Sequence, residues 1–386
     1  MSSRRVAHDV VIVGGGVIGL SVGWRAAAAG LRVAVIDPRP GAGASRVAGG
    51  MLAAVNEVQY GEQPLLALSL ASAARYPSFI DELEAVTGRP TEYRATGTLA
   101  VALDADDRAA LRELHTFQTS LGLAAQWLSG RECRSLEPML APGVTGGLLV
   151  AGDHQVDNRA LTAALITAVE AAGGTLWRAR VTEFRVLGDR VVGVRLDDDE
   201  VLAAGQVVLA AGSWSGEVAG LPDRAVPPVR PVKGQILRLR LPAGHPGLLA
   251  RTVRGTTRGS HVYLVPRANG EVVVGATAEE QGFDTGVTAG GVYQLLRDAH
   301  DLVPGVTELT LAECDAGLRP GTPDNAPILG PGPLAGLVYA TGHHRNGILL
   351  APVTADAVAG YLVEGVLPDV AAPFTLDRLV DARAET

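Results

Sequence analysis

The pattern of apolar and polar positions becomes regular a few residues into the chain. Residues 10–13 form a continuous apolar run, which is typical of a parallel strand covered on both faces. A segment with helical apolar spacing follows and ends near Gly30, and a second predicted strand over residues 32–36 ends in Asp37. This order predicts a strand, a helix and a second strand of one parallel sheet.

Patterns of the same kind return only after a long interruption. Residues 65–86 are helix-like, and alternating strand patterns follow them. A helix and a strand containing Val181 come next, then a buried strand that ends in Ala211 and Gly212. The last piece is a strand, a glycine-rich turn and a helix over residues 336–362. A nucleotide-binding domain interrupted in this way is typical of flavoproteins, whereas a nicotinamide dehydrogenase usually completes its sheet in the first half of the chain.

The composition limits the classes of protein to consider. The chain has 386 residues, which is enough for two domains of ordinary size with apolar cores. Apolar residues make up 47% of the chain and charged residues 19%, which indicates a folded protein rather than a disordered one. The formal charge of −8 at pH 7 argues against nucleic acid or an anionic membrane as a general partner.

Neither a disulfide framework nor a metal site is indicated. The two cysteines form no CxxC pair, and the eight histidines show no metal-ligand spacing. No apolar run reaches the roughly 18 residues that a membrane span needs. The N-terminal residues lead into the first strand without a signal-peptide pattern. We therefore expect a soluble, cytoplasmic protein without a metal.

Three glycines at GxGxxG spacing lie between the first strand and the first helix. Gly14 suits a tight turn, Gly16 suits the approach of backbone N–H groups to a pyrophosphate, and Gly19 suits close packing of the helix on the strand. Val17 and Ile18 open the helix, whose N-terminus adds the positive end of a dipole. These residues predict a site for the phosphates of a dinucleotide.

Asp37 extends this prediction to the ribose. It is placed to accept hydrogen bonds from ribose hydroxyls, and it would repel a 2′-phosphate. A glycine turn before a helix is also a common structural feature, but here the strand, the helix and the acid lie in register. The motif alone does not separate FAD from NAD.

Seven segments together resemble the glycine oxidases of thiamine biosynthesis, within the flavoenzymes related to D-amino acid oxidase. They are GGGVIGLS, ASRVAGGMLA, GDHQVDNRAL, VVLAAGSWS, YLVPR, GLRPGTPDNAPILG and TGHHRNGILLAP, and they extend over nearly the whole chain. With this resemblance we predict an α/β fold with an α+β insert. A Rossmann-like FAD-binding domain would comprise residues 1–88, 150–228 and 311–386, and an antiparallel-sheet substrate domain residues 89–149 and 229–310.

The resemblance also implies the chemistry. FAD would be bound non-covalently, and glycine, sarcosine and small D-amino acids would be oxidised to an imine that hydrolyses to glyoxylate, while oxygen is reduced to hydrogen peroxide. The imine would supply thiazole synthesis for thiamine, and the enzyme would be a homotetramer. Two alternatives stay open: a dehydrogenase of D-amino acids or secondary amines with another electron acceptor, and a flavin-binding sensor without turnover.

Small residues after the second strand are expected to lie against the flavin, since bulk there would exclude it; a purely structural turn is the alternative. Backbone N–H groups before the last helix are expected to face the negative charge of the reduced flavin. Beyond the glycine motif and Asp37, the cofactor residues predicted in this way are Ser45, Arg46, Gly49, Gly50, Met51, Val181, Ala211, Gly212, Arg345, Asn346, Gly347, Ile348 and Leu349.

Arg319 is expected to bind the substrate carboxylate. A guanidinium binds carboxylates through two parallel hydrogen bonds and is costly to bury unpaired, and Arg319 lies among glycines, prolines and apolar residues. The resemblance assigns the matching arginine this role. The alternative is a structural ion pair with Asp315 or Asp324.

Three further residues are expected near the substrate. The resemblance gives Tyr263 a second hydrogen bond to the carboxylate and places the Arg345 side chain nearby. His261 lies two residues before Tyr263 and should share its strand face. The alternatives are an ordinary strand tyrosine, a solvated arginine and a structural histidine.

Lysine and cysteine side chains can react with or influence a flavin, and the chain has one lysine and two cysteines. Lys233, the only lysine, is expected on an inserted strand, either near the flavin, where a cation would promote oxygen reduction, or exposed to solvent. Cys314 does not match the position at which the related sarcosine oxidases attach flavin, because the TPD segment at 322–324 places that position near Gly317. Covalent flavin is therefore not expected.

Overall fold

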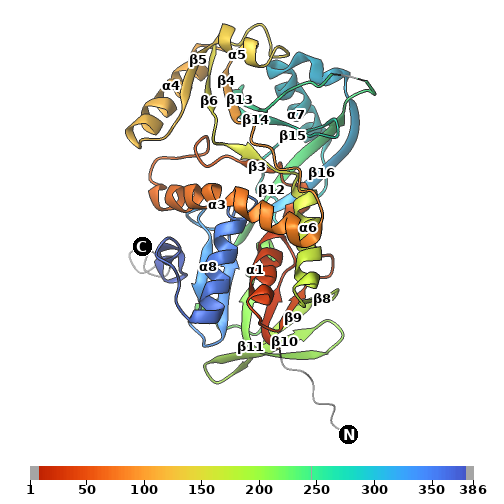
Figure 1. Ribbon diagram of the computed structural model, residues 1–386, viewed down its shortest axis with the longest axis vertical. Coiled ribbons are helices and arrows are strands. Elements are labelled where there is room, and N and C mark those ends of the chain that lie inside the picture. The colour runs from red at the N-terminus through yellow and green to blue at the C-terminus, as the bar shows by residue number, and fades with distance from the viewer. Residues whose placement is uncertain (1–7, 245, 380–386) are drawn as a thin grey trace.

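The computed structural model describes residues 8–244 and 246–379. These residues form two large sheets, one in the lower half and one in the upper half of the view in Figure 1. The chain passes between the two regions several times, so each region is built from segments far apart in the sequence.

The first sheet has a parallel centre. Its main path runs in the order β17–β18–β11–β1–β2–β8, and β1 pairs in parallel with both β11 and β2. The strands of this path are β1 (His8–Val13), β2 (Val33–Ile36), β8 (Thr175–Trp177), β11 (Val201–Leu209), β17 (Ile328–Pro331) and β18 (Leu337–Thr341). The apolar runs of these strands, except β8, are buried because both faces are covered.

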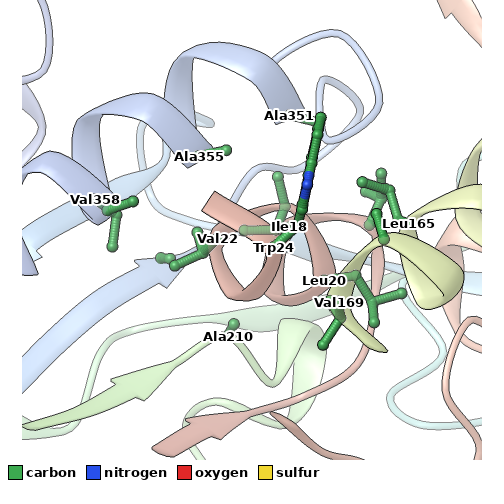
Figure 2. Packing of buried hydrophobic residues seen from close by; sticks show 14 of the residues in the cluster. Ile18, Leu20, Val22, Trp24, Leu165, Val169, Ala210, Ala351, Ala355 and Val358 are labelled. Carbon is green, nitrogen blue, oxygen red and sulfur yellow. The ribbon is translucent and has the colours of Figure 1, made fainter. Parts of the chain in front are cut away.

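Helices cover one face of this sheet. They are α1 (Val17–Ala28), α6 (Asn158–Ala171) and α8 (Ala351–Glu364), and α3 (Gln63–Thr87) packs on α6 and α8. Figure 2 shows α1 between Ala355 of α8 and Leu165 of α6, with Leu20 and Trp24 in the buried cluster. Gly23 lets α1 approach the sheet closely, because a Cβ there would lie 2.8 Å from a methyl of Val35. This packing fixes the N-terminus of α1 at the end of β1.

An antiparallel meander covers the opposite face. It comprises β9 (Val181–Leu187) and β10 (Arg190–Leu196), which pairs with β11. Phe184, Val191 and Val194 are fully buried in the cluster that covers this face. The lower region therefore has three layers: helices, parallel sheet and meander.

The second sheet has the strand order β16–β12–β15–β14–β13–β4–β6–β5. Its neighbours are antiparallel except for β13 and β4, which are parallel. The strands are β4 (Thr98–Ala102), β5 (Gln126–Ser129), β6 (Gly146–Val150), β12 (Arg230–Arg240), β13 (Thr252–Thr257), β14 (Ser260–Pro266), β15 (Glu271–Gly275) and β16 (Thr310–Gly321). Three helices accompany them: α4 (Ala105–Ser120), α5 (Gly130–Leu136) and α7 (Ala289–Leu302).

The remaining elements are short. They are α2 (Ala44–Val47), the paired strands β3 (Met51–Leu52) and β7 (His154–Gln155), and the 3₁₀ turns η1 (Gly212–Trp214), η2 (Asp223–Ala225), η3 (Pro304–Glu308) and η4 (Ala372–Phe374). Within residues 8–244 and 246–379, no helix is both long and apolar enough to cross a membrane.

The chain returns to the first sheet later than the predicted boundary at residue 311. Strand β16 pairs with β12 from Thr310 opposite Arg240 to Gly321 opposite Arg230. Residues 311–321 therefore lie in the second sheet, and the prediction for this segment is wrong. The apolar pattern identifies a strand but not the sheet that it joins.

Candidate active site

The turn between β1 and α1 requires its glycines. Gly14 has φ +110°, and a Cβ there would lie 2.3 Å from the carbonyl oxygen of Ala210, at the end of β11. A Cβ on Gly19 would lie 1.9 Å from the carbonyl oxygen of Gly14. The turn is therefore pressed between the helix and the central strands, as the motif predicts.

Two predicted side chains fix this turn. The hydroxyl of Ser45 accepts a hydrogen bond from Val17 N–H at 2.9 Å, and the two carboxylate oxygens of Asp37 accept from Gly15 N–H at 2.8 Å and Arg39 N–H at 2.7 Å. Each Asp37 oxygen keeps lone pairs for a further donor. Ser45 thus contacts the helix N-terminus itself.

Backbone N–H groups remain free at two places. The amides of Gly16 and Ile18 make no hydrogen bond within the described residues, and neither do those of Gly347, Ile348 and Leu349. Free amides at a helix or turn start suit an anionic or acceptor-rich ligand. Both groups therefore have the chemistry expected of the predicted cofactor residues.

The second group differs from the prediction in two details. Helix α8 begins at Ala351, so the free amides belong to the turn before the helix. Asn346 N–H bonds to His343 O at 2.8 Å and is already satisfied. Hydroxyls of α3 hold this turn, since Ser72 donates to Leu349 O at 2.7 Å and Tyr76 donates to Ile348 O at 3.0 Å.

The segment from Arg46 to Met51 is held from the second sheet by two buried arginines. Arg267 donates to Gly49 O at 2.8 Å, and Arg238 donates to Arg46 O at 3.2 Å. Burial lowers the pKa of Arg267 to about 10. Gly50, with φ +74°, has no room for a side chain, because a Cβ would lie 2.1 Å from the carbonyl oxygen of Val156. The small residues here let two regions meet.

Four further predicted cofactor residues are Arg46, Val181, Ala211 and Gly212. The Arg46 guanidinium is 47% exposed and faces Glu313, so the carbonyl of Arg46, not its side chain, holds the segment. Val181 begins β9 and is buried against the parallel sheet. Ala211 and Gly212 follow β11, which ends at Leu209, and Gly212 opens the turn η1 with φ +55°.

One face of the second sheet carries Arg319, Tyr263 and His261, and we call it the site face. Tyr263 is paired with Gly275, which is paired with Ile236 of β12. Val232 of β12 is paired with Arg319. Because Val232 and Ile236 are four residues apart on one strand, they share a face, and Arg319 and Tyr263 therefore lie on the same side of the sheet. Ile236 on this face packs with Val47 and Met51 of the lower region. The site face is therefore turned toward the predicted cofactor residues.

The Tyr263 ring lies between two glycines. A Cβ on Gly275 would lie 2.3 Å from the Tyr263 hydroxyl, and one on Gly49 would lie 2.8 Å from the ring. The hydroxyl makes no hydrogen bond within the described part of the chain. Burial raises the pKa of Tyr263 above its usual value, so the hydroxyl stays protonated as a donor.

Arg319 has no acidic partner among the described residues. Its Nη1 donates to the carbonyl oxygen of Thr277 at 3.0 Å, and a Cβ on Gly234 would lie 2.5 Å from the guanidinium. Asp315 is paired with Arg159 at 3.0 Å and Asp324 with Arg378 at 2.8 Å. The alternative of a structural ion pair from Arg319 to either acid is therefore wrong.

Arg345 meets a residue that the sequence patterns did not indicate. Glu57 lies on the loop before α3, with Oε2 at 3.1 Å from Arg345 Nε and Oε1 at 3.0 Å from Arg254 Nη1. Burial would raise the pKa of Glu57, but Arg254 and Arg345 outweigh it, so the net shift is downward and the carboxylate stays ionised.

His261 shares the site face but is exposed at its edge. Its Nδ1 lies 3.0 Å from Thr256 Oγ1. Partial burial, together with Arg254 and Arg345, lowers its pKa. His344, which follows the last strand, was not predicted; burial and then Arg345 and Arg319 lower its pKa to about 4. Both imidazoles are neutral at pH 7.

Lys233 and Cys314 lie on the opposite face of the sheet. Lys233 is 1% exposed and pairs with Asp284 at 2.5 Å, so both expectations for it are wrong: it lies neither near the predicted cofactor residues nor in solvent. Cys314 is paired with Leu237, which packs in the cluster on that far face. Gly317 is on the site face, where a Cβ would lie 2.9 Å from Val47. This placement agrees with non-covalent FAD.

The chain matches the family described as FAD dependent oxidoreductase over residues 9–361. It belongs to this family. The FAD-dependent oxidoreductase is 36% identical over 375 residues to the glycine oxidase of Geobacillus kaustophilus, covering 96% of this chain and 97% of that protein. The crystal structure of glycine oxidase from Geobacillus kaustophilus matches with a TM-score of 0.87, covering 96% of this chain and 99% of that one.

Two further relatives carry other names than glycine oxidase. The oxidoreductase is 36% identical over 361 residues to the bifunctional protein ThiO/ThiG of Trichormus variabilis, covering 93% of this chain and 53% of that protein. It thus spans about half the length of that relative. It is 32% identical to the hydrogen cyanide synthase subunit HcnC of Pseudomonas aeruginosa, covering 96% of each.

The residues of this FAD-dependent oxidoreductase fit the cofactor. The glycine turn leaves the Gly16 and Ile18 amides for phosphate oxygens, and Asp37 has lone pairs for ribose hydroxyls. The free amides at residues 347–349 suit the acceptor atoms of a flavin ring. The sequence patterns did not predict four residues that make contacts in the candidate site: Arg238, Arg267, Glu57 and Arg254. Only Arg267 carried a signal, as the arginine that ends the segment YLVPR.

Proposed function

We propose that this enzyme oxidises glycine, and with it sarcosine and small D-amino acids, to imines, with oxygen as the final electron acceptor and hydrogen peroxide as a product. The imine of glycine hydrolyses to glyoxylate or supplies thiazole synthesis for thiamine. The observation that carries the proposal is the Arg319 guanidinium, whose hydrogen-bond partners among the described residues are all backbone carbonyl oxygens, on a face turned toward the predicted cofactor residues. The relatives named glycine oxidase and ThiO/ThiG support this substrate and pathway.

The proposed roles of the side chains follow from their donors. Arg319 binds the substrate carboxylate through its guanidinium, and Tyr263 adds a hydrogen bond from its hydroxyl. Holding the carboxylate at two points orients the Cα–H bond, and such orientation supplies a large part of the barrier reduction. Bound FAD supplies hydride acceptance from that Cα and electron transfer to oxygen. Arg345 lies on the turn beside the site and adds positive charge.

The test is the visible absorption spectrum of the purified FAD-loaded protein, kept without oxygen, before and after glycine is added. We expect the yellow colour to bleach with glycine and to return when air is admitted. A yellow protein that glycine leaves unchanged would contradict glycine as substrate, and sarcosine, D-alanine and D-proline would follow. A protein that binds no FAD would contradict the flavoenzyme function as a whole.

A dehydrogenase that uses an acceptor other than oxygen is the second candidate. The relative named as a hydrogen cyanide synthase subunit favours it, because the name shows that chains of this family and length also work as parts of other enzymes. Bleaching by glycine without return of colour in air would support the dehydrogenase. The homotetramer and the cytoplasmic location remain predictions; light scattering should give the mass of four 39.8 kDa chains.

A further inference from the structure

Glu57 lies between two arginines of the candidate site and has no part in the proposed function. Its two carboxylate oxygens lie 3.0 Å from Arg254 Nη1 and 3.1 Å from Arg345 Nε. The exposed fractions of the Glu57, Arg254 and Arg345 side chains are 16%, 20% and 31%. Each carboxylate oxygen of Glu57 therefore balances the positive charge of one guanidinium, and all three side chains are largely shielded from water.

Contacts from two other elements fix the loop that carries Glu57. Asp153 accepts hydrogen bonds from Val55 N–H at 3.0 Å and Asn56 N–H at 2.7 Å. The Gln118 amide donates to Val55 O at 3.1 Å. Arg254 is fixed as well, since it lies on β13 directly opposite Tyr263. The position of Glu57 is thus built into the site.

The charges explain what Glu57 does there. Arg319, Arg254 and Arg345 are close enough that each affects the ionisation of Glu57. If Arg319 binds the substrate carboxylate, Arg254 and Arg345 would form a second place for an anion. Two guanidinium groups suit a carboxylate well, and an existing carboxylate between them both occupies their donors and repels another.

We propose that Glu57 is a specificity-determining residue that restricts this site to amines with a single carboxylate. It takes the place of a second substrate carboxylate at Arg254 and Arg345. The class excluded is that of amines with two carboxylates, of which iminodiacetate is a small example. The choice of amine rests on the proposed function, whereas the selection between anions does not depend on turnover.

The test compares the wild type with Glu57→Gln, both loaded with FAD. Acetate and malonate, which have no amine to oxidise, are titrated while the absorption of the bound flavin is followed. We expect Glu57→Gln to raise the affinity for malonate relative to acetate about tenfold or more, because the negative charge between the two guanidinium groups is removed and the amide occupies fewer of their donors. The kcat/KM for iminodiacetate relative to glycine should rise in parallel.

Glu62→Gln is the matched control. Glu62 lies just before α3, near enough to Arg345 and Glu57 to interact with their charges, but its carboxylate makes no ion pair within the described residues. Its substitution therefore removes the same charge without breaking a contact to a guanidinium. The ratio of malonate to acetate affinity should stay at the wild-type value in this variant. An equal gain in both variants, or no gain in Glu57→Gln, would overturn the proposal.

Glu57→Ala is the second variant in case Glu57→Gln fails to bind FAD, and the same gain is expected. Loss of FAD binding in both variants would assign Glu57 to the fold and overturn its role in selection. A gain in malonate affinity in a protein that glycine does not reduce would contradict the proposed substrate alone. Reduction by glycine without that gain would contradict only the role of Glu57.

Discussion

Two cations on neighbouring strands of the second sheet point to opposite faces and meet different partners. Lys233 of β12 is 1% exposed, and its ammonium lies 2.5 Å from a carboxylate oxygen of Asp284. Arg319 of β16 is one position away in the ladder, on the site face, and its guanidinium donates to the carbonyl oxygen of Thr277 at 3.0 Å. Lys233 therefore has a counter-charge, whereas Arg319 has none among the described residues.

The difference separates a structural cation from a functional one. A buried charge with its partner in the same chain is complete as part of the fold. A half-buried guanidinium with only carbonyl partners keeps donors and charge for a ligand. This criterion is useful in a chain with a single lysine and many arginines, where the number of arginines says little about function.

The strongest test of this comparison removes the uncompensated cation. Arg319→Leu should lower kcat/KM for glycine about 10³-fold, because two charge-assisted hydrogen bonds to the carboxylate are lost. The flavin spectrum should be unchanged, and Tm should stay the same or rise, since no protein carboxylate loses its partner. Steady-state kinetics and thermal unfolding check both parts. Unchanged kinetics would remove Arg319 from the site.

A second test displaces the same guanidinium without removing it. Gly234→Ala places a Cβ 2.5 Å from the Arg319 guanidinium, and the far end of this flexible side chain can move away at little cost to the fold. We expect kcat/KM for glycine to fall about 100-fold, since misplacement by about 1 Å has effects of this size. Gly290→Ala is the control, because a Cβ there meets no atom within 4 Å. Equal kinetics in both variants would contradict the placement of Arg319.

The first strand–helix–strand unit was predictable to within about two residues, because its information is local. The helix ends at Ala28 against a predicted Gly30, and the second strand covers residues 33–36 against a predicted 32–36. The segment at 311–321 was assigned to the wrong sheet. Its partner β12 lies about 80 residues earlier in the sequence, and no local pattern of β16 names that partner.

Residues of the candidate site were predictable only where the local sequence marked them, either by an unusual residue type or by a motif. Arg319 stood out as a charge in an apolar, glycine-rich segment, and Tyr263 came from a resemblance. Glu57 belongs to a loop without periodic pattern, and its partner Arg254 is 197 residues away. Gly234 and Gly275 looked like ordinary strand glycines, although they make room for Arg319 and Tyr263. These contacts depend on strand register, which the sequence alone does not give.

His343 extends the comparison to a buried base that has no charged partner in the part of the chain that the structure describes. It is 2% exposed, its Nε2 lies 3.0 Å from Thr354 Oγ1, and burial lowers its pKa from 6.5 to about 3. The neutral form is favoured in the folded state, so its stabilisation is present above pH 6.5 and is lost as the pH falls toward 3. At pH 5 the free energy of unfolding should be lower by about 2 kcal/mol from this group.

Urea unfolding at pH 7.5 and pH 5 checks this, with His343→Gln as the comparison. The amide can still reach Thr354 but does not titrate, so the variant should lose less stability than the wild type over this range. His344, whose pKa is lowered to about 4, acts in the same direction in both proteins, and the difference between them isolates His343. Equal losses would show that His343 does not carry the pH dependence.

The smallest effects should come from the compensated cation. Lys233→Met should leave kcat/KM for glycine within about twofold and Tm within about 2 °C of the wild type, because an apolar side chain of similar length can fill the buried place of the ammonium and leaves Asp284, which is 57% exposed, to water. Asp284→Ala should lower Tm by about 3 °C or more, since it leaves the buried ammonium with only the more distant Glu279, at 3.9 Å. The order of the two Tm values tests the structural role of Lys233. If Asp284→Ala lowers Tm more than Lys233→Met does, the ammonium is a charge that the folded protein has to neutralise. A large loss of activity in Lys233→Met, with FAD still bound, would give the far face a part in catalysis and break the distinction between Lys233 and Arg319.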